Sequence, residues 1–223
     1  MDHEKPIIYV KNVRKVYRMG DEEVVALKRI NLRIYKGEVC CIFGTSGSGK
    51  STLLNQLAGM EKPTKGQVFI RGKNISDMNE EELAAFRQEH MSFIFQSYNL
   101  LPSMTAVENV AMPLMFKGMD RKKREAMAEE MLKRVGLSHR LHHYPSQMSG
   151  GQQQRAGIAR AFVSRPEVVF ADEPTGNLDT KTTAEIMDMV MRFARRFNQT
   201  IILGTHDPGM SRYADRIVTL VDG

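Results

Sequence analysis

A lysine and a serine close a glycine-rich segment, GTSGSGKS, between residues 44 and 51. Glycines at this spacing let backbone N–H groups turn inward around a triphosphate, and a helix that starts here adds the positive end of its dipole. Lys50 would reach the β- and γ-phosphates, and the Ser51 hydroxyl would ligate Mg²⁺. An ordinary glycine-rich turn does not explain a Lys-Ser pair at a helix start. The segment therefore predicts a site for a nucleoside triphosphate and Mg²⁺.

Two carboxylates follow an apolar segment much later in the chain, in VVFADEP. Ligands of open α/β sheets lie at the carboxyl ends of the strands, so Asp172 and Glu173 should face the phosphates. Asp172 would hold Mg²⁺ through water, and Glu173, one residue further, would polarise the attacking water. Alone, this pair would be an ordinary charged loop after a strand. Together with the phosphate loop it indicates a nucleotide site, and a nucleoside kinase could share both features.

A second glycine-rich segment, MSGGQQQR, begins at Met148. Ser149 and the glycines precede a helical pattern, so they form another positive helix start that can face an anion. Gln96 and His206 each follow a predicted buried strand. Taken separately, Gln96 is interpreted as a surface glutamine and His206 as a histidine that caps a turn before Pro208. In combination with both glycine-rich segments, they favour a nucleotide site.

These residues need a framework of strands and helices to position them. The first ~35 residues alternate and are rich in Val and Ile, which predicts antiparallel strands. Beyond them, short apolar strands alternate with helices, one of which Asn79 caps with Glu82 in a capping box. We therefore expect an α/β fold with a mainly parallel sheet in one domain over residues 1–223. Its nucleotide-binding core with the β subdomain would occupy about 1–96 and 166–223, and an inserted helical subdomain about 97–165.

Composition narrows the class of protein. The chain has 223 residues, of which 42% are hydrophobic and 26% charged, enough for one domain with a sizeable core. No export signal and no membrane-spanning run is expected. Cys40 and Cys41 are neighbours in a predicted strand, so they point to opposite faces and should stay reduced in the cytoplasm.

The charge and the methionines leave several interpretations open. A net charge of +6 is compatible with nucleic acid, an anionic membrane or a polyanionic ligand, but a solvated basic surface is the preferred interpretation. The most basic helical pattern mixes both signs and lacks interleaved aromatic residues. Met112 and Met115 are interpreted as core residues, with an adaptable docking surface as the alternative.

The order of the motifs resembles the ATP-binding-cassette (ABC) ATPases over essentially the whole chain. The segments that carry this resemblance are GTSGSGKST, FQS, MSGGQ, VVFADE, GNLD and TH. Within the family, FQSYNLLPSMTAVENVAMPL, MSGGQQQR and ADEPTGNLD are most similar to the lipoprotein-releasing and macrolide-efflux branch. That branch also contains cell-division and peptide-resistance ATPases. Met148 stands where the family usually has leucine, and GNLD replaces the commoner SALD.

The resemblance implies that two copies pack head to tail, so that each ATP lies between the phosphate loop of one copy and the MSGGQ segment of the other. Ser149 and Gly151 would then contact the partner's γ-phosphate. It also implies that Tyr17 stacks on adenine, that Thr52 reaches the α-phosphate, and that Asp179 lines the dimer seam. The expected ATP-binding residues are Tyr17, Gly44, Ser46, Gly47, Ser48, Gly49, Lys50, Ser51, Thr52, Ser149, Gly150, Gly151, Gln152 and Asp179.

The family also implies the catalytic and metal-binding roles. Ser51, Gln96 and Asp172 would hold Mg²⁺. Glu173, Lys50, His206 and Gln96 would serve catalysis, His206 at the γ-phosphate and Gln96 also at the membrane partner.

The expected protein is thus the ATP-hydrolysing motor subunit of a transporter, at the inner face of the cell membrane. Closure and reopening of the dimer would drive a separate integral membrane permease that exports or extracts a lipoprotein, peptide or drug. One alternative is an ATP-dependent switch for a membrane complex in cell division. A soluble ABC protein acting on nucleic acid is disfavoured, because the chain has neither a coiled-coil insertion nor a second cassette. No nucleic-acid partner is expected.

Overall fold

The computed structural model describes residues 5–20 and 22–223. The first four residues, part of the segment in which no export signal is expected, and Asp21 lie outside the described residues. The chain divides into two compact units. The first comprises the chain up to Arg87 and from Asn198 onward, and the second is Gln88–Phe197.

The first unit opens with an antiparallel sheet. Its strands follow the order β2-β1-β4-β5, with bounds β1 Ile8–Met19, β2 Glu22–Ile34, β4 Lys65–Ile70 and β5 Lys73–Asn74. Alternate apolar residues of these strands, such as Ile8, Val10 and Leu27, are fully buried. Alternation of this kind is what a sheet with one buried face requires. The predicted antiparallel strands in the first ~35 residues are confirmed.

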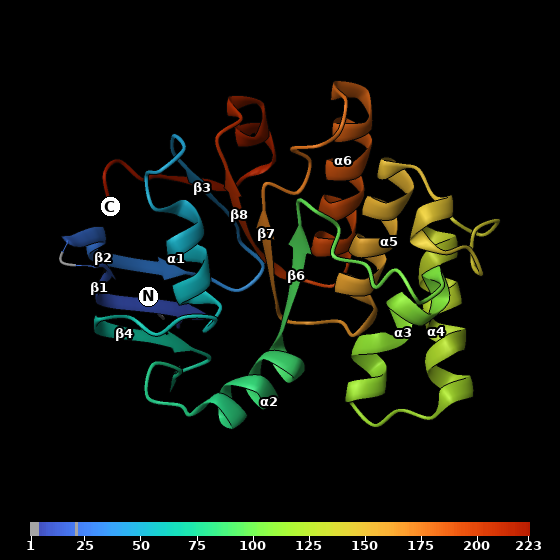
Figure 1. Cartoon of the computed structure of the whole chain (residues 1–223), viewed down its shortest axis with the longest axis horizontal. Helices are drawn as coiled ribbons and strands as arrows, with labels where there is room; N and C mark the ends of the chain where they lie inside the picture. The colour runs from blue at the N-terminus through green and yellow to red at the C-terminus, as the bar shows by residue number, and fades with distance from the viewer. Residues whose placement is uncertain (1–4, 21) are drawn as a thin grey trace. The chain divides into compact units, whose positions relative to one another are not determined.

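Three parallel strands form the other part of the first unit. β3 (Val39–Phe43) lies between β8 (Thr200–Thr205) and β9 (Arg216–Thr219), and it pairs with both in parallel. A central strand of a parallel sheet is covered on both faces and is therefore apolar along its length. The first four residues of β3 are fully buried. Helix α1 (Lys50–Leu57) follows β3 and packs against β8 (Figure 1).

Helix α2 (Glu80–His90) leads from the first unit into the second. The Asn79 N–H donates to Glu82 Oε2 at 2.8 Å, and the Glu82 N–H donates to Asn79 Oδ1 at 2.9 Å. This reciprocal pair confirms the predicted capping box. It satisfies two N–H groups, one on the capping residue and one in the first turn.

The second unit holds two parallel strands and most of the helices. β6 (Met91–Phe95) pairs with β7 (Val168–Asp172). The helices are α3 (Ala106–Phe116), α4 (Arg121–Arg134), α5 (Gly150–Val163) and α6 (Thr180–Arg196). Helices α3, α4 and α5 pack against one another, as Figure 1 shows. The stretch predicted to be mainly helical therefore lies inside this unit. Short 3₁₀ helices follow at Pro145–Gln147 and, in the first unit, Pro208–Tyr213.

The structure confirms the predicted burial of Cys40 and Cys41 and contradicts the core interpretation of Met115. Cys40 and Cys41 are buried and unbridged, and burial raises the pKa of the Cys40 thiol to about 12. The core interpretation of Met115 is wrong, because 39% of this residue is exposed, and Met112 is half-buried. Proline 113 lies between them in α3, and both methionines line a pocket on this helix. In the described part of the chain, no helix is both long and apolar enough to cross a bilayer.

Candidate functional site

The phosphate loop begins directly after β3. Gly44 follows the last residue of the strand, and Lys50 begins α1. Gly49, the capping residue, has φ 99°, and a Cβ there would lie 2.7 Å from the Ala26 carbonyl oxygen, so only glycine fits. Among the described residues, nothing accepts a hydrogen bond from the N–H groups of residues 45–47, which lie in an exposed turn. The loop therefore presents free donors at a helix start.

A buried ammonium and a buried hydroxyl complete this loop. Lys50 is only 7% exposed, and its Nζ donates to the Thr45 carbonyl at 2.8 Å. The Ser48 hydroxyl is buried, and it has no hydrogen-bond partner among the described residues. A buried polar atom without a partner costs about 1–3 kcal/mol, which a phosphate oxygen would recover. The predicted ligands Ser51 and Thr52 lie in the first turn of α1, exposed and half-buried respectively.

His206 lies at the same edge of the sheet as the phosphate loop. In the β3–β8 ladder, Phe43 is paired with Thr205, so Gly44 and His206 are the next residues of adjacent parallel strands. The structure therefore brings the predicted γ-phosphate residue and the start of the phosphate loop together within the first unit. His206 is exposed.

Tyr17 lies on β1 of the same unit and is half-buried. Its hydroxyl donates to Glu61 Oε2 at 2.7 Å. Burial raises the pKa of the Tyr17 phenol, and the Glu61 carboxylate raises it further, while a hydrogen bond with the Thr52 side chain acts in the opposite sense. The phenol is thus neutral at physiological pH. Glu61 was not predicted as a site residue.

The second unit carries the acids and the glutamine. In the β6–β7 ladder, Phe95 is paired with Asp172, so Gln96 and Glu173 follow at one edge. Asp172 is the last residue of β7, and Glu173 adopts a left-handed backbone with φ 45°. Left-handed backbone at a non-glycine residue costs about 1–3 kcal/mol and is concentrated at functional sites. The geometry therefore singles out Glu173 from an ordinary charged loop.

Gln96 is held by an asparagine that sequence reasoning missed. Gln96 Nε2 donates to Asn177 Oδ1 at 3.2 Å, and Asn177 Nδ2 donates to the Gln96 carbonyl at 3.1 Å. This pair fixes the side-chain amide and leaves its Oε1 oxygen available to a cation. Asn177 belongs to the GNLD segment, whose similarity to the family was the only signal in the sequence that this asparagine has a role.

The MSGGQ segment forms the start of α5. Ser149 caps the helix: its Oγ accepts from the Gln152 N–H at 3.4 Å, and Gln152 Oε1 accepts from the Ser149 N–H at 3.0 Å. Gln152, predicted to contact the nucleotide, thus has a capping role in this structure. A Cβ on Gly150 would lie 2.8 Å from the Tyr98 hydroxyl, so the loop after Gln96 reaches this helix start. Ser149 itself is exposed.

Asp179 caps α6 in a similar way. Its carboxylate accepts from the Thr182 hydroxyl at 2.6 Å and from the Thr182 N–H at 3.0 Å. These two hydrogen bonds lower the pKa of Asp179, so the exposed carboxylate is ionised at neutral pH. The structure therefore presents a fixed negative charge at the residue predicted for the dimer seam.

Two polar side chains of α5 donate hydrogen bonds to the loops after β6 and β7, and neither was predicted. Gln154 is fully buried, and its Nε2 donates to the carbonyls of Phe95 and Pro174. These carbonyls flank Gln96 and Glu173 respectively. One amide thus fastens the ends of both strands to the helix that the MSGGQ segment begins.

Arg160 connects the loop after Gln96 to α5. Its Nη1 donates to the Asn99 carbonyl at 2.6 Å and its Nη2 to the Tyr98 carbonyl at 2.9 Å. Tyr98 and Asn99 have φ values of 59° and 48°, so the guanidinium stabilises two consecutive left-handed residues. Burial lowers the pKa of this guanidinium. The available signal was a charged residue inside the apolar stretch of α5.

Comparisons with known proteins agree with this arrangement. The model of the family described as "ABC transporter" matches residues 27–176. An ABC transporter ATP-binding protein of Methanocaldococcus jannaschii is 47% identical over 217 residues, which cover 97% of this chain and 96% of that protein. The chain belongs to the ABC transporter family. The cassette is also 46% identical to the macrolide export ATP-binding/permease protein MacB of Pasteurella multocida, over 98% of this chain but only 34% of MacB.

Solved cassettes have the same fold. The dimeric, post-hydrolysis structure of the ATP-binding cassette MJ0796, bound to ADP and Pi, superposes with a TM-score of 0.90 and 43% identity. The match covers 97% of this chain and 95% of that one. A second dimeric structure of MJ0796 matches equally well, at 44% identity. The predicted α/β fold of an ABC ATPase is confirmed, and the cassette is an ATP-binding ATPase of this family.

Replacement of Arg160 tests the internal support of the catalytic loops. Arg160→Leu leaves the Tyr98 and Asn99 carbonyls without their donor, so we expect the free energy of unfolding to fall by about 2–4 kcal/mol. Urea denaturation followed by circular dichroism measures this loss. Arg121→Leu is the control, because exposed Arg121 forms an i,i+4 salt bridge with Glu125, and surface ion pairs of this kind contribute little to stability. Equal losses in both variants would contradict the role given to Arg160.

Proposed function

We propose that this cassette is the motor subunit of a transporter whose membrane part is a separate protein. The observation that carries the proposal is the partial match to MacB. MacB joins ATP binding and a permease in one chain, and the cassette matches 34% of it. In this proposal a partner chain supplies the permease, and the cassette acts at the inner face of the membrane.

In this proposal, residues 44–52 bind the triphosphate. The free N–H groups and the unpaired Ser48 hydroxyl are donors without an acceptor, and Lys50, whose ammonium donates to the Thr45 carbonyl, adds a positive charge. Together they support an anionic ligand. Mg²⁺ would be held by Ser51, Gln96 and Asp172. Their hydroxyl, amide and carboxylate oxygens suit this ion, which normally keeps phosphates and water as its remaining ligands. The ion neutralises charge on the phosphate oxygens.

Glu173 is the proposed general base. Its carboxylate follows the metal-binding Asp172 by one residue, in a left-handed backbone held by Gln154 through the next carbonyl. A carboxylate so placed can accept a proton from water as it attacks the γ-phosphate, while His206 contacts that phosphate.

A second copy of the chain is the proposed partner in the ATP site. MJ0796 forms a dimer in both of the structures compared. Within this chain, Ser149 opens an exposed helix start whose dipole is suited to an anion. A symmetric dimer uses both surfaces, because each copy would offer its helix start to the ATP of the other.

The proposed docking surface for the permease is a methionine pocket on α3. This pocket of about 190 Å³ has an apolar lining of Met104, Ala111, Met112 and Met115. Flexible thioether side chains adapt to apolar partners, and an amphipathic helix is a common occupant of such surfaces. Exposed Met115 and half-buried Met112, which follow the loop after Gln96 on the second unit, therefore support contact with a short cytoplasmic helix of a membrane protein.

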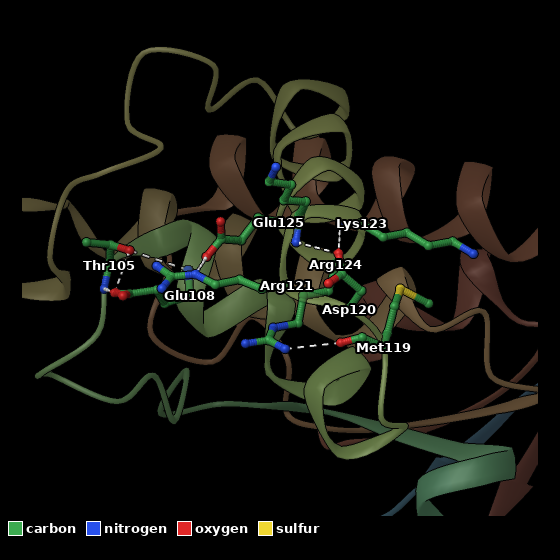
Figure 2. Close-up of polar contacts among 9 residues, drawn as sticks. Thr105, Glu108, Met119, Asp120, Arg121, Lys123, Arg124 and Glu125 are labelled. Carbon is green, nitrogen blue, oxygen red and sulfur yellow. Dashed lines mark hydrogen bonds and ion pairs between the residues drawn. The ribbon is translucent and has the colours of Figure 1, made fainter.

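Charged residues surround this pocket in a fixed arrangement. As Figure 2 shows, Glu108 Oε2 accepts from the Thr105 hydroxyl and N–H at 2.8 Å, and Arg121 Nε donates to Glu125 Oε1 at 2.8 Å. Hydrogen bonds from Thr105 lower the pKa of Glu108. Glu108, Arg121, Arg124 and Glu125 line the pocket together with the methionines, so an occupant would meet both apolar and charged groups. The substrate would be chosen by the permease, and the similarity to the macrolide export protein MacB favours export of a drug.

Glu173→Gln tests the proposed base. The amide keeps the shape of the side chain but cannot accept the proton, so we expect retained ATP binding and a fall in kcat of at least about 100-fold. Because ATP would persist, the variant should elute as a dimer in size-exclusion chromatography with ATP, and the wild-type chain with ADP is the control. Hydrolysis at the wild-type rate would remove Glu173 from this role.

Mixing two inactive variants tests the partner's contribution. Lys50→Ala disables the phosphate loop and Ser149→Arg disables the helix start, so each homodimer should hydrolyse almost no ATP. A mixed dimer with sites built from both chains has one intact site, and we expect hydrolysis to reappear on mixing. A γ-phosphate-reactive ATP analogue on a tagged chain should crosslink to position 149 of the untagged chain. Crosslinks confined to the tagged chain would contradict the shared site.

Met115→Glu tests the docking surface. A carboxylate in the methionine pocket should reduce co-purification of integral membrane proteins with the tagged cassette, while ATPase activity of the isolated cassette is unchanged. Met60→Glu is the matched control, because Met60 is 42% exposed but lies in the first unit. If wild-type cassette recovers nucleic acid and no membrane protein, the motor role is wrong.

A further inference from the structure

Glu61 lies in the loop after α1 and gathers three donors on one carboxylate. The Tyr17 hydroxyl donates to its Oε2 at 2.7 Å, and Lys15 Nζ lies 3.2 Å from the same oxygen. Asn55 Nδ2 donates to its Oε1 at 3.1 Å. Burial acts to raise the pKa of Glu61, but hydrogen bonds from Tyr17, Lys15 and Asn55 outweigh it, and the pKa is lowered. The carboxylate is therefore ionised at neutral pH.

The strand that carries Tyr17 is irregular at this point. The register of β1 against β2 shifts between Val13 and Lys15 and again between Lys15 and Val16. Bulges of this kind redirect side chains and are common beside active sites. The irregular segment is fastened to the loop that contains Glu61: the Val16 N–H donates to Thr64 Oγ1 at 3.0 Å, and Lys15 Nζ donates to the Lys62 carbonyl at 2.9 Å.

The same carboxylate also connects Tyr17 to the helix of the phosphate loop. Asn55 is a residue of α1, whose first turn contains Lys50 and Ser51. The Lys15 ammonium lies 5.1 Å from the centroid of the Tyr17 ring, within range of a cation–π contact, so one face of the ring is occupied. A planar base can therefore stack only on the opposite face.

We propose that Glu61 is a positioning residue of the ATP site, which holds the Tyr17 ring at a fixed distance and angle from the phosphate-binding helix so that adenine stacks on it. The inference rests on the proposed contact between Tyr17 and adenine. Without the carboxylate, the phenol loses its acceptor and the ring can rotate away from the base. The phosphates, bound by residues 44–52, do not depend on this contact.

The test distinguishes weaker binding of the adenine base from weaker binding of the phosphates. In Glu61→Ala, KM for ATP should rise about ten-fold, the change expected for loss of a hydrogen bond to a charged group, while kcat stays within about two-fold. Competitive inhibition by inorganic triphosphate, which has no base, should be unchanged. Glu61→Gln keeps an acceptor for the phenol and should recover part of the affinity. Glu81→Ala, on α2 and exposed, is the control and should behave as the wild-type chain does.

A double-mutant cycle assigns the effect to Tyr17. In the Tyr17→Phe background the phenol is absent, so Glu61→Ala should raise KM far less than in the wild-type background. Additive effects, or equal weakening of ATP and inorganic triphosphate, would overturn the inference. A wild-type chain that neither hydrolyses ATP nor binds inorganic triphosphate would instead refute the proposed function itself. Should Glu61→Ala not fold, the same comparison is made with Glu61→Leu, which also removes the acceptor, and an unchanged KM in the wild-type background would overturn the inference.

Discussion

A nucleoside triphosphate is bound only if the protein replaces the water that surrounds its phosphates. Donors for this purpose must be kept without partners of their own before the nucleotide arrives, and unpaired donors destabilise the chain that carries them. In the phosphate loop they are grouped between a buried strand, β3, and the start of α1. The Lys50 ammonium donates a hydrogen bond to the Thr45 carbonyl, so this buried charge has a polar partner within the loop. The fully buried strands on which the loop is mounted stabilise the fold enough to offset this cost.

In the second unit, polar side chains of α5 stabilise loops whose backbone is sterically disfavoured. The loops after β6 and β7 contain three non-glycine residues, Tyr98, Asn99 and Glu173, whose left-handed backbone is sterically disfavoured. Gln154 and Arg160 supply the restraint from the interior of α5. Because this helix begins at Ser149, a displacement of the helix start would be felt at the loops after β6 and β7. The interior polar contacts thus make one rigid piece of helix and loops.

The residues that sequence reasoning identified share a property: their roles follow from local order along the chain. Glycine spacing predicts the phosphate loop, and apolar runs predict strands whose next residues, such as Gln96, Glu173 and His206, lie at a sheet edge. The order and spacing of motifs were enough for the fold and the family. The interpretation of Met115 as a core residue failed, because the sequence does not reveal which face of α3 lacks a covering element.

The residues that were missed act through contacts between distant segments. Asn177, Arg160 and Glu61 all bind backbone or side-chain atoms that are remote in sequence, by 81, 61 and 44 residues respectively. Nothing in their neighbours indicates which carbonyl or phenol they will meet. Such contacts depend on tertiary packing, and only a three-dimensional structure reveals them.

The methionine pocket on α3 has a chemical consequence as well as a mechanical one. Thioether sulfur is oxidised by peroxide to a sulfoxide, which is polar and chiral, and accessible methionines such as Met115 are converted before buried ones. A sulfoxide here would wet the apolar centre of the pocket and leave the phosphate loop untouched. Under the proposed docking role of this pocket, oxidative stress would separate ATP turnover from transport, and reductases specific for methionine sulfoxide would restore the connection.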